Sequence, residues 1–243
     1  MFRMTFPPAA PASLNQAACT RALTWPFFLW IAGLVLLFFP HSFDFPAYVY
    51  AVKTLLCAGL LSVLKPWRFA PCHSVKGAAP LGLLMGLAVY LLWALPESSP
   101  WPGVTAWYQR WLIMMPGTLP DYSASWCYAY SHHPVLALLK LFGSAFIIAP
   151  IEEFFFRGFL MRWLTQKQWH TLPFAGVSRY AFWVTVAVFA FEHDRYLGGA
   201  LAGMVYGALA CGTGSLRAPI IAHVTTNLLL GLHVLLFNAY GFW

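Results

Sequence analysis

Two adjacent glutamates and an arginine lie inside the long apolar run of residues 136–163: Glu152, Glu153 and Arg157. A charged side chain at the centre of a membrane costs about 2.5–3.5 kcal/mol on insertion scales, so ionisable residues at that depth are functional candidates by default. Glu153 and Arg157 are four residues apart, so on a helix they share a face and can form an ion pair. Glu152 points about 100° away from that pair. The pattern predicts an ion pair beside a second carboxylate that is available for chemistry.

Polar side chains recur in two later apolar runs, again with a spacing of four residues. Phe189 and His193 lie near the end of one run, and His223 and Asn227 lie in the last. A single histidine in an apolar helix is most often a hydrogen-bonded core residue, but three helices that each supply polar groups predict a shared site. Together they offer a base, an imidazole, an ion pair and hydrogen-bond donors. These groups can activate a water and stabilise an oxyanion.

Three neighbours of these residues complete the expectations for the site. Pro150 precedes Glu152 by two residues, and a proline inside a helix removes one backbone hydrogen bond. We expect a kink there that opens a polar pocket beside Glu152. Glu192 and Asp194, on either side of His193, are expected to face away from the site or toward the aqueous edge.

The composition requires a membrane around these elements. The chain is 60% hydrophobic and 9% charged, whereas an average soluble domain is about 45–50% apolar and about 25% charged. These proportions exclude a soluble enzyme, a disordered chain and a coiled coil. They predict an all-α fold, a polytopic transmembrane helical bundle with seven or eight spans. The expected spans lie near residues 24–40, 46–64, 79–95, 136–163, 180–193, 197–212 and 217–238.

The spans are expected to form one integral membrane domain over residues 1–243. Residues 1–22 are predicted to be a cytoplasmic tail, and residues 96–132 an extramembrane loop with an interfacial or re-entrant helix near 104–115. If that helix crosses the membrane, the count of spans becomes eight. Residues 136–238 supply the catalytic core helices. The first apolar run is not followed by a small-residue cleavage site, so we expect it to remain as the first span.

Basic residues are concentrated in alternate loops, which predicts the orientation. One set of loops and ends carries most of them: Arg3, Arg21, Lys65, Arg68, Lys76, Arg162, Lys167, Arg179 and Arg217. The opposite loops carry only Arg110 and Arg195. Because cytoplasmic loops are enriched in lysine and arginine, the N-terminus is expected in the cytoplasm. The net charge of +7 does not predict nucleic-acid binding, since the basic residues are scattered singly and form no patch.

A stripe of glycines in the run 197–212 predicts close helix packing. Gly199, Gly203 and Gly207 recur every four residues, so they lie on one face of a helix. Small residues with this spacing allow a neighbouring membrane helix to approach closely. This feature is structural and says nothing about chemistry.

The three motifs, in their order along the chain, resemble those of the CAAX-protease and bacteriocin-processing (CPBP, or Abi) family of intramembrane glutamate proteases. The motifs are Glu152-Glu153-x-x-x-Arg157, Phe189-x-x-x-His193 and His223-x-x-x-Asn227. They cover about a third of the chain, and the first 130 residues carry no motif of this family. The stretches 193–203 and 223–231 look most like the CAAX-protease-related proteins that accompany exosortase systems in Gram-negative bacteria.

The resemblance implies an intramembrane endopeptidase that cleaves a peptide bond in a membrane-anchored protein or peptide. By motif position, Glu152 would be the general base and would hold the attacking water together with His193. Glu153, paired with Arg157, would orient the site.

The last motif and the setting follow from the same resemblance. His223 and Asn227 would form the oxyanion hole over the scissile carbonyl. The protein would reside in the bacterial inner membrane as a multi-pass protein, with an exosortase-type sorting system as a candidate partner. The resemblance calls for no cofactor and no metal.

Two other interpretations stay open at this point. Glu152, His193 and His223 could be three ligands of an open zinc site, although the chain has no HExxH motif and its five cysteines form no CxxC pair. A proton-coupled transporter or a scaffold is the other alternative, because intramembrane glutamates and histidines also serve proton relays. The motifs lie in one half of the chain without an inverted repeat, which argues against a transporter.

Overall fold

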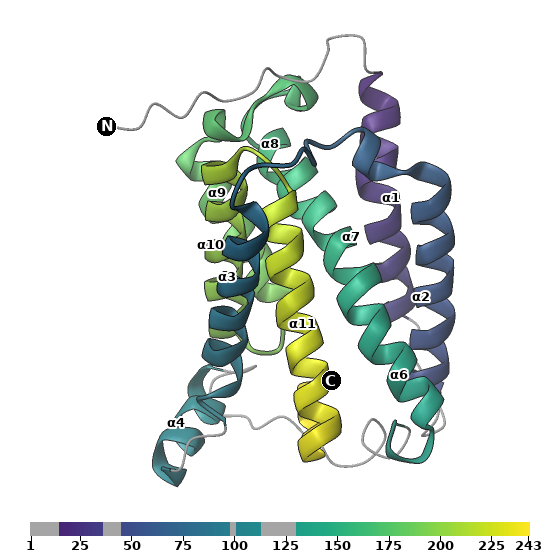
Figure 1. Cartoon of the computed structure of the whole chain (residues 1–243), viewed down its shortest axis with the longest axis vertical. Helices are drawn as coiled ribbons and strands as arrows, with labels where there is room; N and C mark the ends of the chain where they lie inside the picture. The colour runs from purple at the N-terminus through teal and green to yellow at the C-terminus, as the bar shows by residue number, and fades with distance from the viewer. Residues whose placement is uncertain (1–14, 36–44, 98–100, 113–129) are drawn as a thin grey trace.

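The structure, a computed structural model, describes residues 15–35, 45–97, 101–112 and 130–243 (Figure 1). Within these ranges the chain forms helices joined by turns and loops, without a strand, which confirms the all-helical prediction. The α-helical elements are α1 (Gln16–Val35), α2 (Phe45–Leu64), α3 (Ala78–Ala94), α4 (Pro102–Leu112), α6 (Pro134–Gly143), α7 (Ala149–Glu153), α8 (Met161–Trp163), α9 (Arg179–Phe191), α10 (Tyr196–Thr213) and α11 (Arg217–Phe237). Short 3₁₀ turns are η2 (Pro66–Arg68), η5 (Trp169–Thr171), η6 (Phe174–Gly176) and η7 (Tyr240–Phe242).

The helices are those of a membrane-embedded protein. Five helical segments are long enough and apolar enough to cross a membrane: Gln16–Val35, Ala47–Arg68, Pro134–Trp163, Tyr196–Thr213 and Arg217–Phe237. Two shorter apolar helices, α3 and α9, coincide with two further expected spans. α4 lies where the sequence predicts an interfacial helix. The count of seven or eight spans therefore stays a prediction.

Parts of three predicted segments lie outside the described residues. These are residues 1–14 of the predicted tail, residues 36–40 of the predicted span 24–40, and residues 98–100 and 113–129 of the predicted extramembrane loop. α1 begins at Gln16, so the end of the predicted tail is helical.

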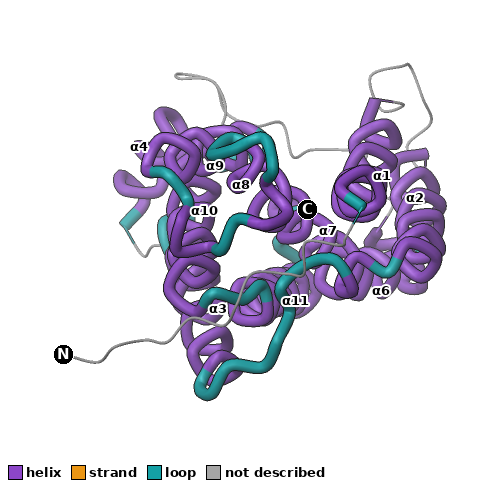
Figure 2. Tube along the Cα trace, turned by 90° about the horizontal axis from the view of Figure 1, so that it is seen from above, coloured by secondary structure: helices purple, strands orange, loops and turns teal. Residues whose placement is uncertain are grey.

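The helices are arranged so that α11 lies between two groups. α1 and α2 pack against each other and against the helical segment that begins with α6, whereas α3, α9 and α10 lie on the other side (Figures 1 and 2). α11 contacts both groups, through α3 and α10 on one side and through α6 and α7 on the other. The three motifs predicted from the sequence are therefore carried by neighbouring elements.

The glycine stripe of α10 is the contact surface for α9, as the sequence predicts. A Cβ atom added at Gly199 would lie 3.0 Å from the Cα of Ala190, and one added at Gly207 would lie 2.7 Å from the ring of Phe182. Gly203, between them, would place a Cβ 3.4 Å from the backbone of α9. Such distances leave no room for a larger side chain, so the stripe sets how closely α9 and α10 approach.

A second close contact, which no periodic pattern in the sequence marks, joins α3 and α11. A Cβ added at Gly86 would lie 2.4 Å from the carbonyl oxygen of Ala222. Thr226 also donates a hydrogen bond to the carbonyl of Gly86 at 2.9 Å. These contacts fix α11 against α3 at the level where α11 carries the third motif.

Candidate active site

The helical segment that carries the acidic motif is irregular. It contains two stretches of π-helix, η3 (Ser144–Ile148) and η4 (Phe154–Leu160), on either side of α7. Pro150 lacks an N–H group, and the wider turns of η3 change the hydrogen bonding just before it, so that the N–H of Ala149 donates to the carbonyl of Ser144, five residues back. The structure thus has π turns on either side of Pro150, and such turns occur often at functional sites. The kink expected at Pro150 stays a prediction.

The predicted ion pair is present and fully buried. Arg157 Nη1 donates to Glu153 Oε1 at 2.9 Å, and the two residues are 1% and 0% exposed. Arg157 Nη2 donates to the carbonyl of Gly203 on α10 at 3.3 Å. The guanidinium lies 4.3 Å from the ring centroid of Phe189 on α9, a distance typical of a cation–π contact. The ion pair therefore joins the acidic motif to two neighbouring helices.

His223, from α11, lies between the two glutamates. Its Nδ1 is 2.9 Å from Glu153 Oε1, and its Nε2 is 3.6 Å from Glu152 Oε2. The ring stacks on Tyr206 with centroids 4.7 Å apart. Since Nδ1 is engaged by Glu153, only Nε2 can interact with a group in front of Glu152.

His193 lies in the turn between α9 and α10, and not inside the predicted span 180–193. α9 ends at Phe191 because the N–H of His193 turns back to the carbonyl of Ala190, three residues earlier. The ring Nδ1 lies 2.7 Å from the carbonyl oxygen of Phe189 and donates to it. In a neutral imidazole this bond leaves Nε2 without a hydrogen, as an acceptor.

Asn227 follows His223 by one turn of α11 and, like His223, faces the helical segment that carries the acidic motif. Its Nδ2 donates to the carbonyl of Ser144 at 3.1 Å. A side-chain amide carries two N–H donors, so one hydrogen bond leaves the second donor for another group.

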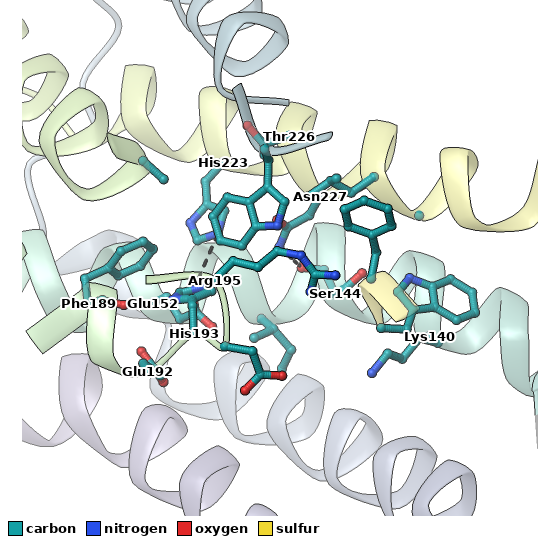
Figure 3. Close-up of a pocket in the computed structure, with 18 of the residues that line it drawn as sticks. Lys140, Ser144, Glu152, Phe189, Glu192, His193, Arg195, His223, Thr226 and Asn227 are labelled. Carbon is teal, nitrogen blue, oxygen red and sulfur yellow. Dashed lines mark hydrogen bonds and ion pairs between the residues drawn. The ribbon is translucent and has the colours of Figure 1, made fainter. Parts of the chain in front are cut away.

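Four of the six predicted site residues line one cavity of about 290 Å³ (Figure 3): Glu152, His193, His223 and Asn227. Glu153 and Arg157 are not among the lining residues and lie behind His223. Glu152 Oε2 is buried and has no hydrogen-bond partner among the described residues. Buried polar atoms are nearly always paired, so this oxygen marks a place for a water or a substrate group.

Glu192 also lines the cavity, and the expectation that it faces away from the site is wrong. Both of its carboxylate oxygens are buried, again without a hydrogen-bond partner in the described part of the chain. Asp194 is exposed, as expected, but contributes to the cavity lining as well. An acidic residue directly beside a motif histidine at the end of an apolar run was the available signal. It was missed because side chains next to each other on a helix point in different directions, whereas here the helix has already ended.

The remaining lining residues show that the cavity follows the helical segment of the acidic motif. Lys140, Ser144 and Ile148 line it at intervals of four residues before Glu152. Lys140 was not identified as a site residue from the sequence, although a lysine inside an apolar run at this spacing was a possible signal.

No three histidine, cysteine, aspartate or glutamate side chains are arranged to hold a metal ion within the ranges that the structure describes. The geometry of Glu152, His193 and His223 therefore gives no support to the zinc alternative.

Comparison with known proteins agrees with the motifs. Residues 134–229 match a protein-family model described as type II CAAX prenyl endopeptidase Rce1-like. The matched segment runs from the start of α6 into α11, covers about two fifths of the chain and contains all three motifs. No curated protein and no solved structure matches the chain. The match supports a membrane protease of the CAAX-protease (CPBP) type, and the segment that carries the site is thus similar to the Rce1-like CAAX prenyl endopeptidases.

Proposed function

We propose that the chain is an intramembrane endopeptidase in which Glu152 and His193 activate a water for attack on a peptide bond of a membrane-anchored protein. The observation that carries this proposal is the convergence of Glu152, His193 and His223 on one cavity, where a carboxylate oxygen of Glu152 is buried without a hydrogen-bond partner among the described residues.

The water would be held by two acceptors. Glu152 offers a carboxylate oxygen, and His193 offers Nε2, since its Nδ1 is committed to the carbonyl of Phe189. A water that donates to both groups turns a lone pair toward the substrate carbonyl. As the oxygen attacks, its proton passes to Glu152. General-base catalysis of this kind contributes about 10²–10⁴-fold to a rate.

The negative charge that develops on the carbonyl oxygen would be stabilised by His223 and Asn227. Asn227 has a second N–H beyond the one that binds Ser144. His223 can donate only from Nε2, which requires both ring nitrogens to be protonated. Glu153, in contact with Nδ1, would balance the charge of such an imidazolium. Preorganised donors of this type are often the largest single contribution to catalysis.

The location and the partner are proposed from the motif resemblance. The bacterial inner membrane, with a cytoplasmic N-terminus, would be the setting. An exosortase-type sorting system would supply a substrate with a membrane-anchored sorting tail.

The test compares membranes from cells that express the full chain, Glu152→Gln or the control Lys167→Gln, which removes a charge from an exposed residue that does not line the cavity. Mass spectrometry of the membrane proteins would identify chain termini that depend on activity. We expect an uncut precursor to accumulate with Glu152→Gln and normal processing with Lys167→Gln. Near-normal processing by a folded, membrane-inserted Glu152→Gln protein would refute the role of this residue.

A further inference from the structure

The two ends of the helical bundle differ in charge. The end at which α1, α9 and α11 begin, here called the basic end, carries most of the described basic residues outside the helix centres: Arg21, Lys65, Arg68, Lys76, Arg162, Lys167, Arg179 and Arg217. The opposite end carries Glu97, Asp194 and Arg110, together with Arg195, which forms an ion pair with Glu97. Because cytoplasmic loops are enriched in lysine and arginine, the basic end is expected to face the cytoplasm.

The cavity extends from Glu152 to the opposite end. Leu34 and Trp93 line it, each one residue before the end of its helix, α1 and α3. The turn 192–195 and the C-terminal Phe242 and Trp243 line it too. All of these residues belong to the opposite end. The lining residues of α11 run the same way, from His223 outward to Gly231.

The basic end, by contrast, is closed over the site. None of the loops 65–77, 164–178 and 214–216 contributes a lining residue. Arg162 is 2% exposed and donates to the carbonyls of Leu172 and His170 at 2.9 and 3.0 Å. These bonds fix the loop between α8 and α9 across this end of the bundle.

A further pair of bonds joins the other two loops of the basic end. The N–H of Leu216 donates to the carbonyl of Pro71 at 2.7 Å. Ser215 Oγ donates to the carbonyl of His73 at 2.9 Å. A peptide that approached from this side would have to break these contacts before it reached Glu152.

We infer that the substrate enters from the side of the membrane opposite to the basic end, which is the non-cytoplasmic side. This inference rests on the proposed function, and it narrows the substrate class. The substrate is a membrane-anchored polypeptide whose scissile segment has been translocated, and that segment reaches Glu152 through the mouth formed by Leu34, Trp93 and Asp194. Segments that remain on the cytoplasmic side are not cleaved.

Thiol labelling tests the direction of access without requiring activity. Single cysteines are introduced into a full-length chain whose native cysteines are replaced by alanine: Asp194→Cys at the mouth, Leu230→Cys inside the cavity, and Lys167→Cys at the basic end as the matched control. Sealed right-side-out membrane vesicles are treated with a small membrane-impermeant methanethiosulfonate reagent, before and after permeabilisation. We expect Asp194→Cys and Leu230→Cys to react in sealed vesicles, and Lys167→Cys to react only after permeabilisation.

Each other outcome overturns the inference. Reaction of Lys167→Cys in sealed vesicles shows that the orientation is reversed. Reaction of Leu230→Cys only after permeabilisation shows that the cavity opens to the cytoplasm.

If the cysteine-free chain does not fold, trypsin is added to sealed vesicles that contain the unmodified chain, and the site of cleavage, Arg110 or Lys167, reports the orientation. Cleavage at Lys167 overturns the inference. Loss of proteolysis in Glu152→Gln is measured separately, so failure of the proposed function is distinguished from failure of the direction of entry.

Discussion

His223 and Glu153 are joined by a hydrogen bond of 2.9 Å from Nδ1 to Oε1, the same oxygen that accepts from Arg157. Because one oxygen receives both donors, the orientation of the imidazole depends on the buried ion pair. Neither Glu153 nor Arg157 lines the cavity, so they act through His223 and are positioning residues.

Loss of the Glu153 charge should cost both stability and activity. Glu153→Gln leaves Arg157 buried without a counter-ion, and removal of one member of a buried pair costs about 3–5 kcal/mol. We expect a lower unfolding midpoint in detergent and a lower kcat. Glu153→Gln combined with Arg157→Met is the control, since it removes both charges and should recover part of the stability but not the activity. Equal stability of the single and double variants would contradict a stabilising ion pair.

Glu152 and His193 should behave as one unit in catalysis. Both are expected to hold the same water, so Glu152→Gln and His193→Ala each lower kcat by about 10²–10⁴-fold. The double variant should be no slower than the slower single variant, because residues that act as a unit have non-additive effects. Steady-state kinetics with a peptide that the enzyme cleaves measures kcat for the two single variants and the double variant. Additive losses would show that the two residues act independently.

Removal of the Asn227 amide should affect the transition state more than binding. Asn227→Ala removes the N–H that is available to an oxyanion, and loss of one such donor costs about 10²–10³-fold in kcat. KM should stay nearly constant. The same variant also breaks the bond to the carbonyl of Ser144, so the unfolding midpoint of Asn227→Ala in detergent is measured beside kcat to separate a loss of packing from a loss of catalysis. A rise in KM alone would assign Asn227 to substrate binding.

The fold and the site differ in how far the sequence predicts them. Glu153 and Arg157 were paired correctly because a spacing of four residues fixes a shared helical face. The stripe from Gly199 to Gly207 was recognised for the same reason. Helical periodicity does not apply where a helix ends, and so the positions of His193 and Glu192 depended on a turn that the apolar pattern does not mark.

A polar pocket beside Glu152 was predicted from the sequence and is present. Its walls could not be predicted, because they come from elements far apart in the sequence. Leu34 of α1 carries no polar group, and Trp93 of α3 is one of 12 tryptophans in the chain, so the residue type marks neither of them. The contact of Gly86 with α11 was missed for a related reason, since glycine is common in membrane helices and one close approach leaves no periodic pattern.

Substitution in the glycine stripe should separate close packing from helix propensity. Gly207→Leu would place its side chain against the ring of Phe182, whereas a Cβ added at Gly212 on the same helix meets no atom within 4 Å. Overpacking costs about 1–3 kcal/mol. We expect Gly207→Leu to lower the unfolding midpoint in detergent and Gly212→Leu to leave it unchanged or raise it. Equal effects of the two substitutions would mean that α9 and α10 do not pack through this stripe.

Glu192 should show a conflict between stability and activity. Both carboxylate oxygens of Glu192 are buried without a hydrogen-bond partner in the described part of the chain, and such a group costs about 1–3 kcal/mol or more of folding free energy. A residue with a purely structural role is expected to have its buried oxygens hydrogen-bonded, whereas a residue that binds water or substrate is expected to leave them open. Glu192→Leu should therefore raise the free energy of unfolding and lower kcat/KM, as expected where activity needs a destabilised site. Glu192→Gln keeps the shape and a polar group, so its free energy of unfolding and its kcat/KM should lie between those of the unchanged chain and of Glu192→Leu. If Glu192→Leu lowered stability and left kcat/KM unchanged, Glu192 would be a structural residue with partners that form only in the membrane.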